Sequence, residues 1–524
     1  MSDPPILSVL IFLPIVAALV CLALPGRGGD STASRWVGLA ASLGTLLIAL
    51  LAVIGFQLGR NGMQLEEQVR WIPQLGISYH LGADGLNILL IALTAILTPS
   101  AILASWQVMG SRAGLFTALL LLLEGTVIGA LASLDLILYF VFWEAMLIPM
   151  YLLISVFGGA RRGYAALKFF IYTSVGSLLM LLAMLYLSSA HTDRVASASP
   201  SFDLRDLLGT QLSVTEQRWL FLAFALAFAI KLPIFPLHSW LADAYTQAPI
   251  TVLVLATMLV KVGAYSFLRF AIPLFPQAAT DLMPILATLA TVGIIYGGLV
   301  AAAQRDMVRL LAFSSLAHLG FIGLGIFVLD VRGAQGSLLQ MVNHGVSSGA
   351  LFLLIGMIGA RVGSYDLAAL GGLARRWPVL TGTMVLAAFS SLGLPGLNGF
   401  VGEFLILLGA FNTQRVLACV ATFGVLLAAI YMLRLFRGAM FGAERAPEPP
   451  TGAITGDLTP RELLALAPLL ILIVWIGVYP SPFLRRTERA AAATISAVHA
   501  PAPNGNALAV GAALLTGATA TTAR

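Results

Sequence analysis

Six ionisable residues lie near the centres of long apolar stretches of this sequence. They are Glu144, Lys231, Lys261, His318, His344 and Glu403. A charge at the centre of a bilayer costs about 2.5–3.5 kcal/mol on insertion scales. Such groups therefore persist where they face a protein interior, pair with one another or border a wet path. Two carboxylates, two lysines and two histidines form a set that can carry protons, because making or breaking a Lys–Glu contact changes which group holds the proton. The alternative interpretation is static pairing that holds helices together.

Three further residues are candidates for an accessory role. Glu124 lies early in its apolar stretch and could equally be a packing or rim residue. His238 and Asp243 follow Lys231 closely along the chain. Lys168 stands at the start of another apolar stretch, where its side chain can reach the membrane interface, so we expect it to be an anchor.

The sequence predicts that two helices are broken beside these charges. Pro233 and Pro236 directly follow Lys231, and proline cannot continue the hydrogen bonding of a helix. Pro395, Gly396 and Gly399 precede Glu403, in a run of glycine, proline and asparagine that cannot form a regular helix. Interrupted helices in corresponding positions of inverted repeats are typical of transport sites near the midplane of a membrane.

Composition identifies the medium in which these helices lie. The chain has 524 residues, of which 59% are hydrophobic and 10% are charged, against about 25% charged in ordinary soluble domains. This excludes a soluble enzyme and a nucleic-acid-binding protein, and it indicates an all-α polytopic membrane protein with about fourteen transmembrane helices. The predicted spans are 5–24, 36–58, 85–106, 114–132, 135–157, 166–189, 218–240, 249–270, 282–303, 309–329, 335–359, 378–411, 415–437 and 462–483.

The spans group into two predicted repeats of five helices each, 114–270 and 282–440, whose fourth helices are the broken ones. Because five is odd, the second repeat is inverted relative to the first. Residues 1–113 would add three helices with an extramembrane loop at 59–84. Residues 441–483 would form a loop and the last helix, and 484–524 a low-complexity tail, poorly ordered from Ala490.

Neither a redox centre nor a metal site is expected in this chain. Its two cysteines, Cys21 and Cys419, are far apart in the sequence, and no Cys-x-x-Cys motif occurs. Loop arginines favour an orientation in which both termini lie on the outer side of the membrane.

Several segments resemble the antiporter-like subunits of proton-pumping NADH:quinone oxidoreductase, respiratory complex I. They are FWEAMLIPMY at 142–151, KLPIFPLHSWLADAYTQAP at 231–249, SSLAHLGF at 314–321, QMVNHG at 340–345 and LPGLNGFVGE at 394–403. The segment LPGLNGFVGE at 394–403 and the chain length resemble those of the M-type branch of this family, the counterpart of mitochondrial subunit 4. Tyr245 departs from the pattern, because the family usually has a histidine there.

The resemblance implies a role for each buried group. Glu144 and Lys231 would form the half-channel open to the cytoplasm, and Lys261 the central link. His318 and His344 would lie on the central hydrated axis, and Glu403 near the outer half-channel.

The resemblance also implies where such a subunit works. NADH, FMN, iron–sulfur clusters and quinone are expected in partner subunits, and none of them in this chain, which would be a non-redox subunit of the enzyme. Its partners would be the L-, N-, K-, A-, J- and H-like subunits of the membrane arm and the lipid of a bacterial cytoplasmic membrane. The alternatives are a subunit of a multisubunit Na⁺/H⁺ antiporter, a membrane-bound hydrogenase module and a purely structural spacer.

Overall fold

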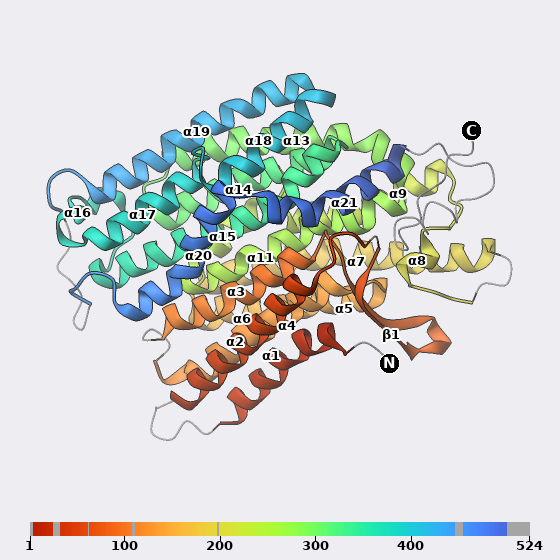
Figure 1. Ribbon diagram of the computed structural model, residues 1–524, viewed down its shortest axis with the longest axis horizontal. Coiled ribbons are helices and arrows are strands. Elements are labelled where there is room, and N and C mark those ends of the chain that lie inside the picture. Colours follow the sequence, from red (N-terminus) through yellow and green to blue (C-terminus); the bar gives the residue numbers. More distant parts are fainter. Residues whose placement is uncertain are drawn as a thin grey trace.

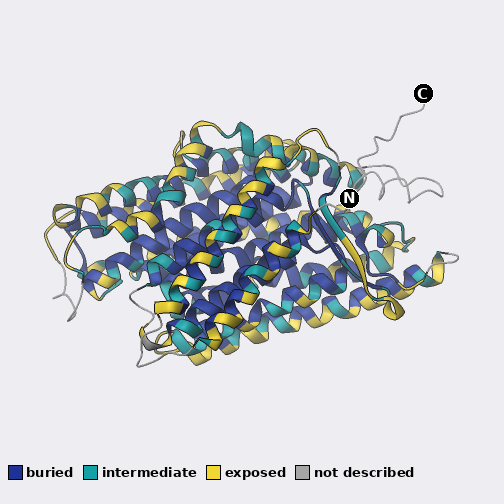
Figure 2. Ribbon diagram, turned by 60° about the horizontal axis from the view of Figure 1, so that its bottom comes forward, coloured by how far each residue is buried: buried dark blue, intermediate teal, exposed yellow. Residues whose placement is uncertain are grey.

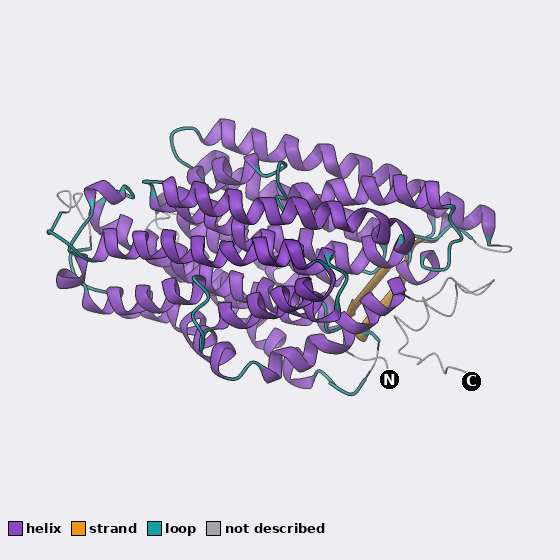
Figure 3. Ribbon diagram, turned by 90° about the horizontal axis from the view of Figure 1, so that it is seen from above, coloured by secondary structure: helices purple, strands orange, loops and turns teal. Residues whose placement is uncertain are grey.

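The computed structural model describes residues 4–24, 32–60, 62–106, 110–195, 199–445 and 454–499. The predicted tail beyond residue 499 and the middle of the loop after the second repeat lie outside these ranges. The helices run roughly alongside one another in an elongated bundle, with a short two-stranded sheet at one end (Figure 3).

Twelve helical segments among the described residues are long and apolar enough to cross a membrane. They are α1 (Ile6–Ala23), α2 (Thr32–Gly55), α3 (Ile88–Ser105), α4 (Ala113–Ala132), α5 with α6 (Leu136–Ala145 and Leu147–Phe157), α7 (Arg162–Arg194), α11 with η4 and α12 (Ile250–Ser266, Phe267–Ala271 and Ile272–Leu274), α13 (Pro276–Ala303), α14 (Met307–Phe327), α15 (Val331–Val362), α19 (Arg415–Met440) and α20 (Pro460–Val478). The predicted polytopic all-α fold is confirmed.

Two broken helices complete the fourteen that the sequence predicts. The first consists of α9 (Val214–Lys231) and α10 (Ser239–Gln247), and the second of α17 (Pro378–Ser391) and α18 (Asn398–Thr413). We call residues 232–238 the first break and residues 392–397 the second break. Gly393 and Gly396 in the second break have φ of 79° and 93°, which side chains with a Cβ rarely adopt.

Two irregularities were not predicted. The helix predicted at 135–157 is interrupted at Met146, between α5 and α6. Pro149 has no N–H to donate to the carbonyl three to four residues earlier, which explains an interruption at this point. The helix predicted at 249–270 ends in the π-helical turn η4. Pro273, two residues after this turn, lacks the N–H that would otherwise donate to the carbonyl of Arg269 within it.

Burial separates the helices into an inner and an outer set. The side chains of α4, α11 and α14 are buried along nearly their whole length, whereas α1, α2, α7, α19 and α20 expose large apolar residues on one side. Figure 2 shows the buried interior surrounded by these partly exposed helices. Apolar residues on the outside are what a lipid-facing surface requires, and a buried interior is where charged side chains are tolerated.

The predicted loop at 59–84 contains a β-hairpin. Strands β1 (Gln64–Ile72) and β2 (Ile77–Ala83) are antiparallel and are joined through the turn η2 (Pro73–Leu75) and Gly76, whose φ is 71°. The hairpin lies at the same end of the bundle as the start of α1 and the short helix α8 (Leu204–Leu207) (Figure 1). Short connections elsewhere are η3 (Gly110–Arg112), η5 (Leu367–Ala369) and α16 (Leu373–Arg376).

The expectation of a poorly ordered tail from Ala490 was wrong for its first part. Residues Ser481–His499 form helix α21, which is amphipathic and packs against α15. Gln335 on α15 donates a hydrogen bond to the Leu484 carbonyl at 3.0 Å. A search for long apolar windows does not detect an amphipathic helix, and the alanine run from Ala490 is a good helix former.

Candidate functional site

Lys231 ends α9 and is 1% exposed. Its Nζ lies 3.6 Å from the centre of the Trp143 ring and donates to the Trp143 carbonyl at 3.2 Å. No ion pair within 4.0 Å joins Lys231 to Glu144, although the sequence suggested such a contact. Glu144 lies one residue before the end of α5, and its Oε1 is buried without a hydrogen-bond partner. In this arrangement the lysine is held by an aromatic face and a carbonyl, while the carboxylate stands apart.

Lys261 and His344 are in direct contact at the centre of the bundle. Lys261, on α11, is 0% exposed, and its Nζ lies 2.6 Å from Nδ1 of His344 on α15. One of these nitrogens donates and the other accepts, so at least one of the two groups is uncharged in this contact. His344 Nε2 is buried without a hydrogen-bond partner.

His318 and Glu403 continue the same line of groups. The rings of His344 and His318 have centroids 5.7 Å apart, and Nδ1 of His318 lies 2.9 Å from Oε1 of Glu403. Gln340 Nε2 donates to the same oxygen at 3.1 Å. On the other side of its ring, His318 Nε2 lies 3.3 Å from Ser391 Oγ and 3.4 Å from the Tyr431 hydroxyl. Lys261, His344, His318 and Glu403 thus form one series of neighbouring proton-binding groups.

A small polar cavity lies beside this series, between α14, α15 and the helix ends that flank the second break. The cavity has a volume of about 10 Å³, enough for on the order of one water molecule. Its lining includes His318, His344 and Asn343, together with serines from α15 and α17. Asn343 Nδ2 donates to the Asn398 carbonyl at 2.7 Å, which ties α15 to the first turn of α18.

The three accessory candidates have different surroundings. Glu124 is 0% exposed, and neither of its carboxylate oxygens has a hydrogen-bond partner. His238, in the first break, stacks on Phe235 with its Nδ1 buried and without a partner. Asp243 pairs with Lys168 at 2.7 Å in a partly exposed position, so it is not joined to the buried series. This ion pair agrees with an anchoring position of Lys168.

The helix-breaking residues lie where the sequence placed them, with one exception. Pro233 and Pro236 lie in the first break, and Pro395 and Gly396 in the second. Gly399 lies inside α18 and does not interrupt it. A Cβ at Gly399 would lie 2.1 Å from the Ser390 carbonyl, so glycine permits the close approach of α18 to the end of α17.

Tyr245, which departs from the expected histidine, is 1% exposed. Its hydroxyl donates to the Ala256 carbonyl at 3.4 Å, and its ring lies edge-on to Phe352. Its contacts are therefore those of a packed aromatic residue at the junction of α10 and α11.

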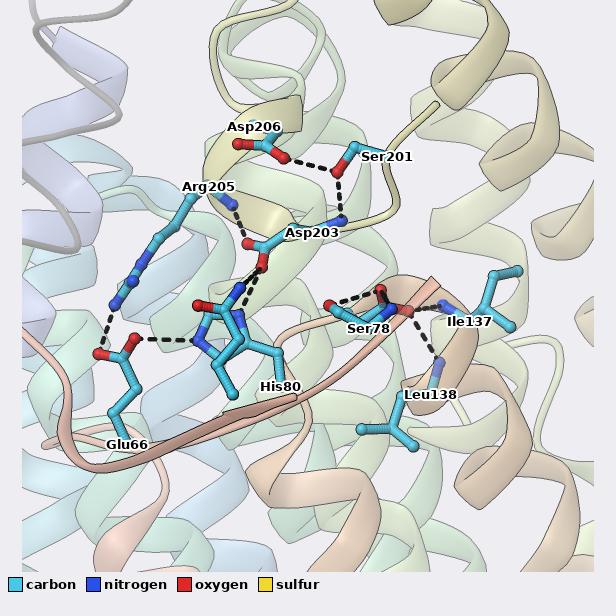
Figure 4. A network of polar contacts seen from close by, with 11 residues as sticks. Glu66, Ser78, His80, Ile137, Leu138, Ser201, Asp203, Arg205 and Asp206 are labelled. Carbon is cyan, nitrogen blue, oxygen red and sulfur yellow. Dashed lines mark hydrogen bonds and ion pairs between the residues drawn. The ribbon is translucent and has the colours of Figure 1, made fainter. Parts of the chain in front are cut away.

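A separate polar network fastens the hairpin to the bundle (Figure 4). His80 is fully buried, with Nδ1 2.5 Å from Asp203 and Nε2 3.2 Å from Glu66, and Glu66 also pairs with Arg205 at 2.6 Å. Burial alone would lower the pKa of His80, but its hydrogen bonds to Asp203 and Glu66 outweigh burial and raise it. The His80 hydrogen bond, opposed by burial and helped by Arg205, lowers the pKa of Glu66 to about 2.

This network reaches the helix that carries Glu144. Asp135, at the start of α5, accepts hydrogen bonds from the Ser78 backbone N–H at 2.9 Å and from the Ser78 hydroxyl at 3.1 Å. Its other oxygen accepts from the backbone N–H groups of Ile137 and Leu138 and so caps the helix. The hairpin thereby fixes the end of α5 that lies opposite Glu144.

Three residues of the site were not singled out from the sequence. Trp143 holds Lys231, Gln340 contacts Glu403, and Gly393 faces the second oxygen of Glu403. An amide within an apolar helix and a tryptophan beside a buried carboxylate are detectable signals, because both have polar atoms that need partners when buried. Among the described residues, no group of three or more His, Cys, Asp or Glu side chains gathers in a way that could hold a metal ion.

Known proteins resemble this chain in sequence and in fold. Residues 133–429 match the family described as "NADH:quinone oxidoreductase/Mrp antiporter, TM". The NADH-quinone oxidoreductase subunit M of Rhodobacter capsulatus is 43% identical over 485 residues, which cover 91% of this chain and 93% of that protein. A chain of respiratory complex I from Thermus thermophilus is 34% identical with a TM-score of 0.85, over 94% of this chain and 99% of that one.

The Mrp complex from Dietzia sp. DQ12-45-1b contains a chain with the same fold. It has a TM-score of 0.81 at 22% identity, over 95% of this chain and all of that one. This likeness extends the fold to antiporter complexes, whereas the higher sequence identities are to subunit M proteins. The chain belongs to the family of NADH:quinone oxidoreductase and Mrp antiporter membrane subunits.

Proposed function

We propose that this chain is a proton-translocating membrane subunit of NADH:quinone oxidoreductase, assembled with the other subunits of the membrane arm. Its similarity along nearly its full length to subunit M proteins supports this assignment. The observation that carries the proposed proton path is the series of neighbouring groups from Lys261 through His344 and His318 to Glu403, in which the two histidine rings lie 5.7 Å apart.

The proposed path starts at Glu144 and Lys231, open to the cytoplasmic side. Lys231 takes up a proton when Glu144 approaches it and gives the proton up when Glu144 withdraws, because a neighbouring carboxylate favours the charged form of a lysine. In this proposal the withdrawn arrangement is the one in which Lys231 contacts Trp143 and forms no ion pair with Glu144. The proton then passes to Lys261, along the two histidines and to Glu403, from which it leaves on the outer side.

The driving energy would come from elsewhere in the complex. We assign NADH, FMN, iron–sulfur clusters and quinone to partner subunits and a non-redox role to this chain, whose two cysteines lie in separate parts of the sequence. Both termini would lie on the outer side, together with the hairpin, which contacts the first turns of α1 through Glu67.

The test replaces Lys231 by alanine in the assembled complex. Inverted membrane vesicles should oxidise NADH with an artificial acceptor at the normal rate, whereas NADH-driven acidification should be lost. The matched control is Lys168→Ala, since Lys168 has the same charge and an ion pair outside the buried series. Normal acidification by an assembled Lys231→Ala complex would overturn the role of this lysine. Sodium-dependent proton exchange without NADH would instead favour the antiporter alternative.

A further inference from the structure

The carboxylate of Glu403 has two oxygens in different surroundings. Oε1 lies 2.9 Å from His318 Nδ1 and 3.1 Å from Gln340 Nε2. Oε2 is directed at the second break, where it lies 2.9 Å from the position that a Cβ on Gly393 would occupy. The side chain itself is 4% exposed, so these neighbours determine its behaviour.

The orientation of the Gln340 amide is determined by a chain of hydrogen bonds. The carbonyl of Asn398 can only accept, so the group of Asn343 that lies 2.7 Å from it is the NH₂ group. The same NH₂ group lies 3.2 Å from Gln340 and therefore faces the amide oxygen of Gln340. This leaves the NH₂ group of Gln340 directed at Glu403, where it can only donate.

Two N–H donors therefore converge on one oxygen of Glu403 whenever His318 carries its proton on Nδ1. An ionised carboxylate oxygen can accept the hydrogen bonds of both His318 and Gln340. A protonated Oε1 would be a poor acceptor for two donors, and its own hydrogen would crowd the two hydrogens that the donors direct at it. When the carboxyl group is protonated, this position favours the oxygen without the proton. The hydroxyl is then stabilised at the Oε2 position, beside Gly393.

We propose that Gln340 is a positioning residue that gives the two oxygens of Glu403 opposite roles, one receiving a proton from His318 and the other releasing it into the second break. His318 in its doubly protonated form transfers the Nδ1 proton to Oε1, which leaves a neutral imidazole and a neutral carboxyl group. Reprotonation of His318 restores both donors, and a half-turn of the carboxyl group brings the hydroxyl to Gly393. Loss of the proton there regenerates the carboxylate. This inference rests on the proposed function.

Gly393 supplies the room for the half-turn. A side chain at this position would meet Oε2 at 2.9 Å, whereas a Cβ at Gly396, in the same break and with similarly positive φ, would have no neighbour within 4 Å. The two glycines therefore separate the effect of backbone strain from the effect of contact with the carboxylate.

The experiment measures NADH-driven acidification of inverted vesicles that carry the assembled complex. Gln340→Met keeps the length of the side chain and removes the donor, and Gln335→Met makes the same change on the same helix, where the amide faces Leu484. We expect Gln340→Met to pump about tenfold more slowly, with Gln335→Met close to the unsubstituted chain. Gly393→Ala should pump more slowly than Gly396→Ala at equal amounts of assembled complex.

The pH profile separates positioning from a merely structural effect. The titratable groups that surround Glu403 are His318 on α14, Tyr431 on α19 and His344 on α15. Because Gln340 is one of the two groups bonded to Oε1 of Glu403, its loss should change the pH at which pumping is half-maximal in Gln340→Met and leave that pH unchanged in Gln335→Met. An unchanged rate and profile in Gln340→Met, or equal losses in Gln340→Met and Gln335→Met, would overturn the inference.

Glu403→Gln distinguishes this inference from the function on which it rests. Lost pumping in Glu403→Gln together with normal pumping in Gln340→Met would overturn the role of Gln340 alone. Normal pumping in Glu403→Gln would overturn the place of Glu403 in the path, and the positioning role with it.

Discussion

The two broken helices carry their charges in opposite ways. At the first break, Lys231 rests on an aromatic ring and a carbonyl, and the nearby Glu144 Oε1 and His238 Nδ1 have no hydrogen-bond partners. At the second break, Glu403 is bonded to His318 and to Gln340. A buried polar group without a hydrogen-bond partner destabilises the fold, so moving to a new partner lowers its free energy, whereas a hydrogen-bonded carboxylate is held in place. The first break is therefore suited to a group that changes partners, and the second to a group that turns without leaving its site.

The largest effect on stability is expected at the second break. Glu403→Leu removes the acceptor of both His318 and Gln340 and leaves two buried groups unpaired, each of which costs about 1–3 kcal/mol. The purified complex should release or unfold this chain at a clearly lower temperature, as thermal scans in detergent would show. Glu403→Gln, which retains an amide oxygen as an acceptor, is the control, and its melting temperature should fall less. Equal melting of Glu403→Leu and the unsubstituted chain would contradict the distinction between the breaks.

The comparison is sharpened by the unpaired carboxyl group of Glu124. Glu124→Met replaces a fully buried side chain whose two oxygens lack partners by an apolar side chain of similar length, so it should raise stability by roughly 1 kcal/mol. The same thermal scan measures the change, and acidification shows whether Glu124 also takes part in transport. A fall in melting temperature as large as that of Glu403→Leu would mean that Glu124 has partners like those at the second break.

The hairpin network should respond to pH outside the buried path. The pKa of His80 in the folded chain is raised above its ordinary value of 6.5. The stability that protonated His80 gives the hairpin is therefore fully present below pH 6.5 and is lost as the pH rises through the raised pKa. Hydrogen exchange at backbone amides of β2 should therefore accelerate on the alkaline side beyond the intrinsic rate increase. His80→Gln should remove this additional pH dependence, and its persistence in that variant would assign it to another group.

The smallest effect is expected at Asp243. Its ion pair with Lys168 is partly exposed, and pairs of this kind contribute about 0–1 kcal/mol. Asp243→Asn should shift the melting temperature little and leave acidification unchanged. A loss of pumping comparable with that of Lys231→Ala would extend the path to this residue.

The sequence predicted the helices, the two breaks and the buried charges, because apolar length and helix-breaking residues are local signals. It could not show which groups touch. Lys231 contacts Trp143 in place of Glu144, and Asp243 pairs with Lys168, since such partners are 75 or more residues apart and are chosen by packing. Gly399 was misplaced because its role is a close helix approach, which resembles a break when read along the chain. The hairpin and α21 were missed because neither forms a long apolar window.

The contact between Lys261 and His344 also limits how many protons can travel together. Two nitrogens 2.6 Å apart share a single hydrogen, since full protonation of both would place two positive charges side by side in a poorly polarisable interior. The pair therefore holds one transferable proton at a time, and it must release that proton before it can accept the next. Protons would cross the centre of the bundle one after another, and each transfer through Lys261 and His344 would have to be complete before the next begins.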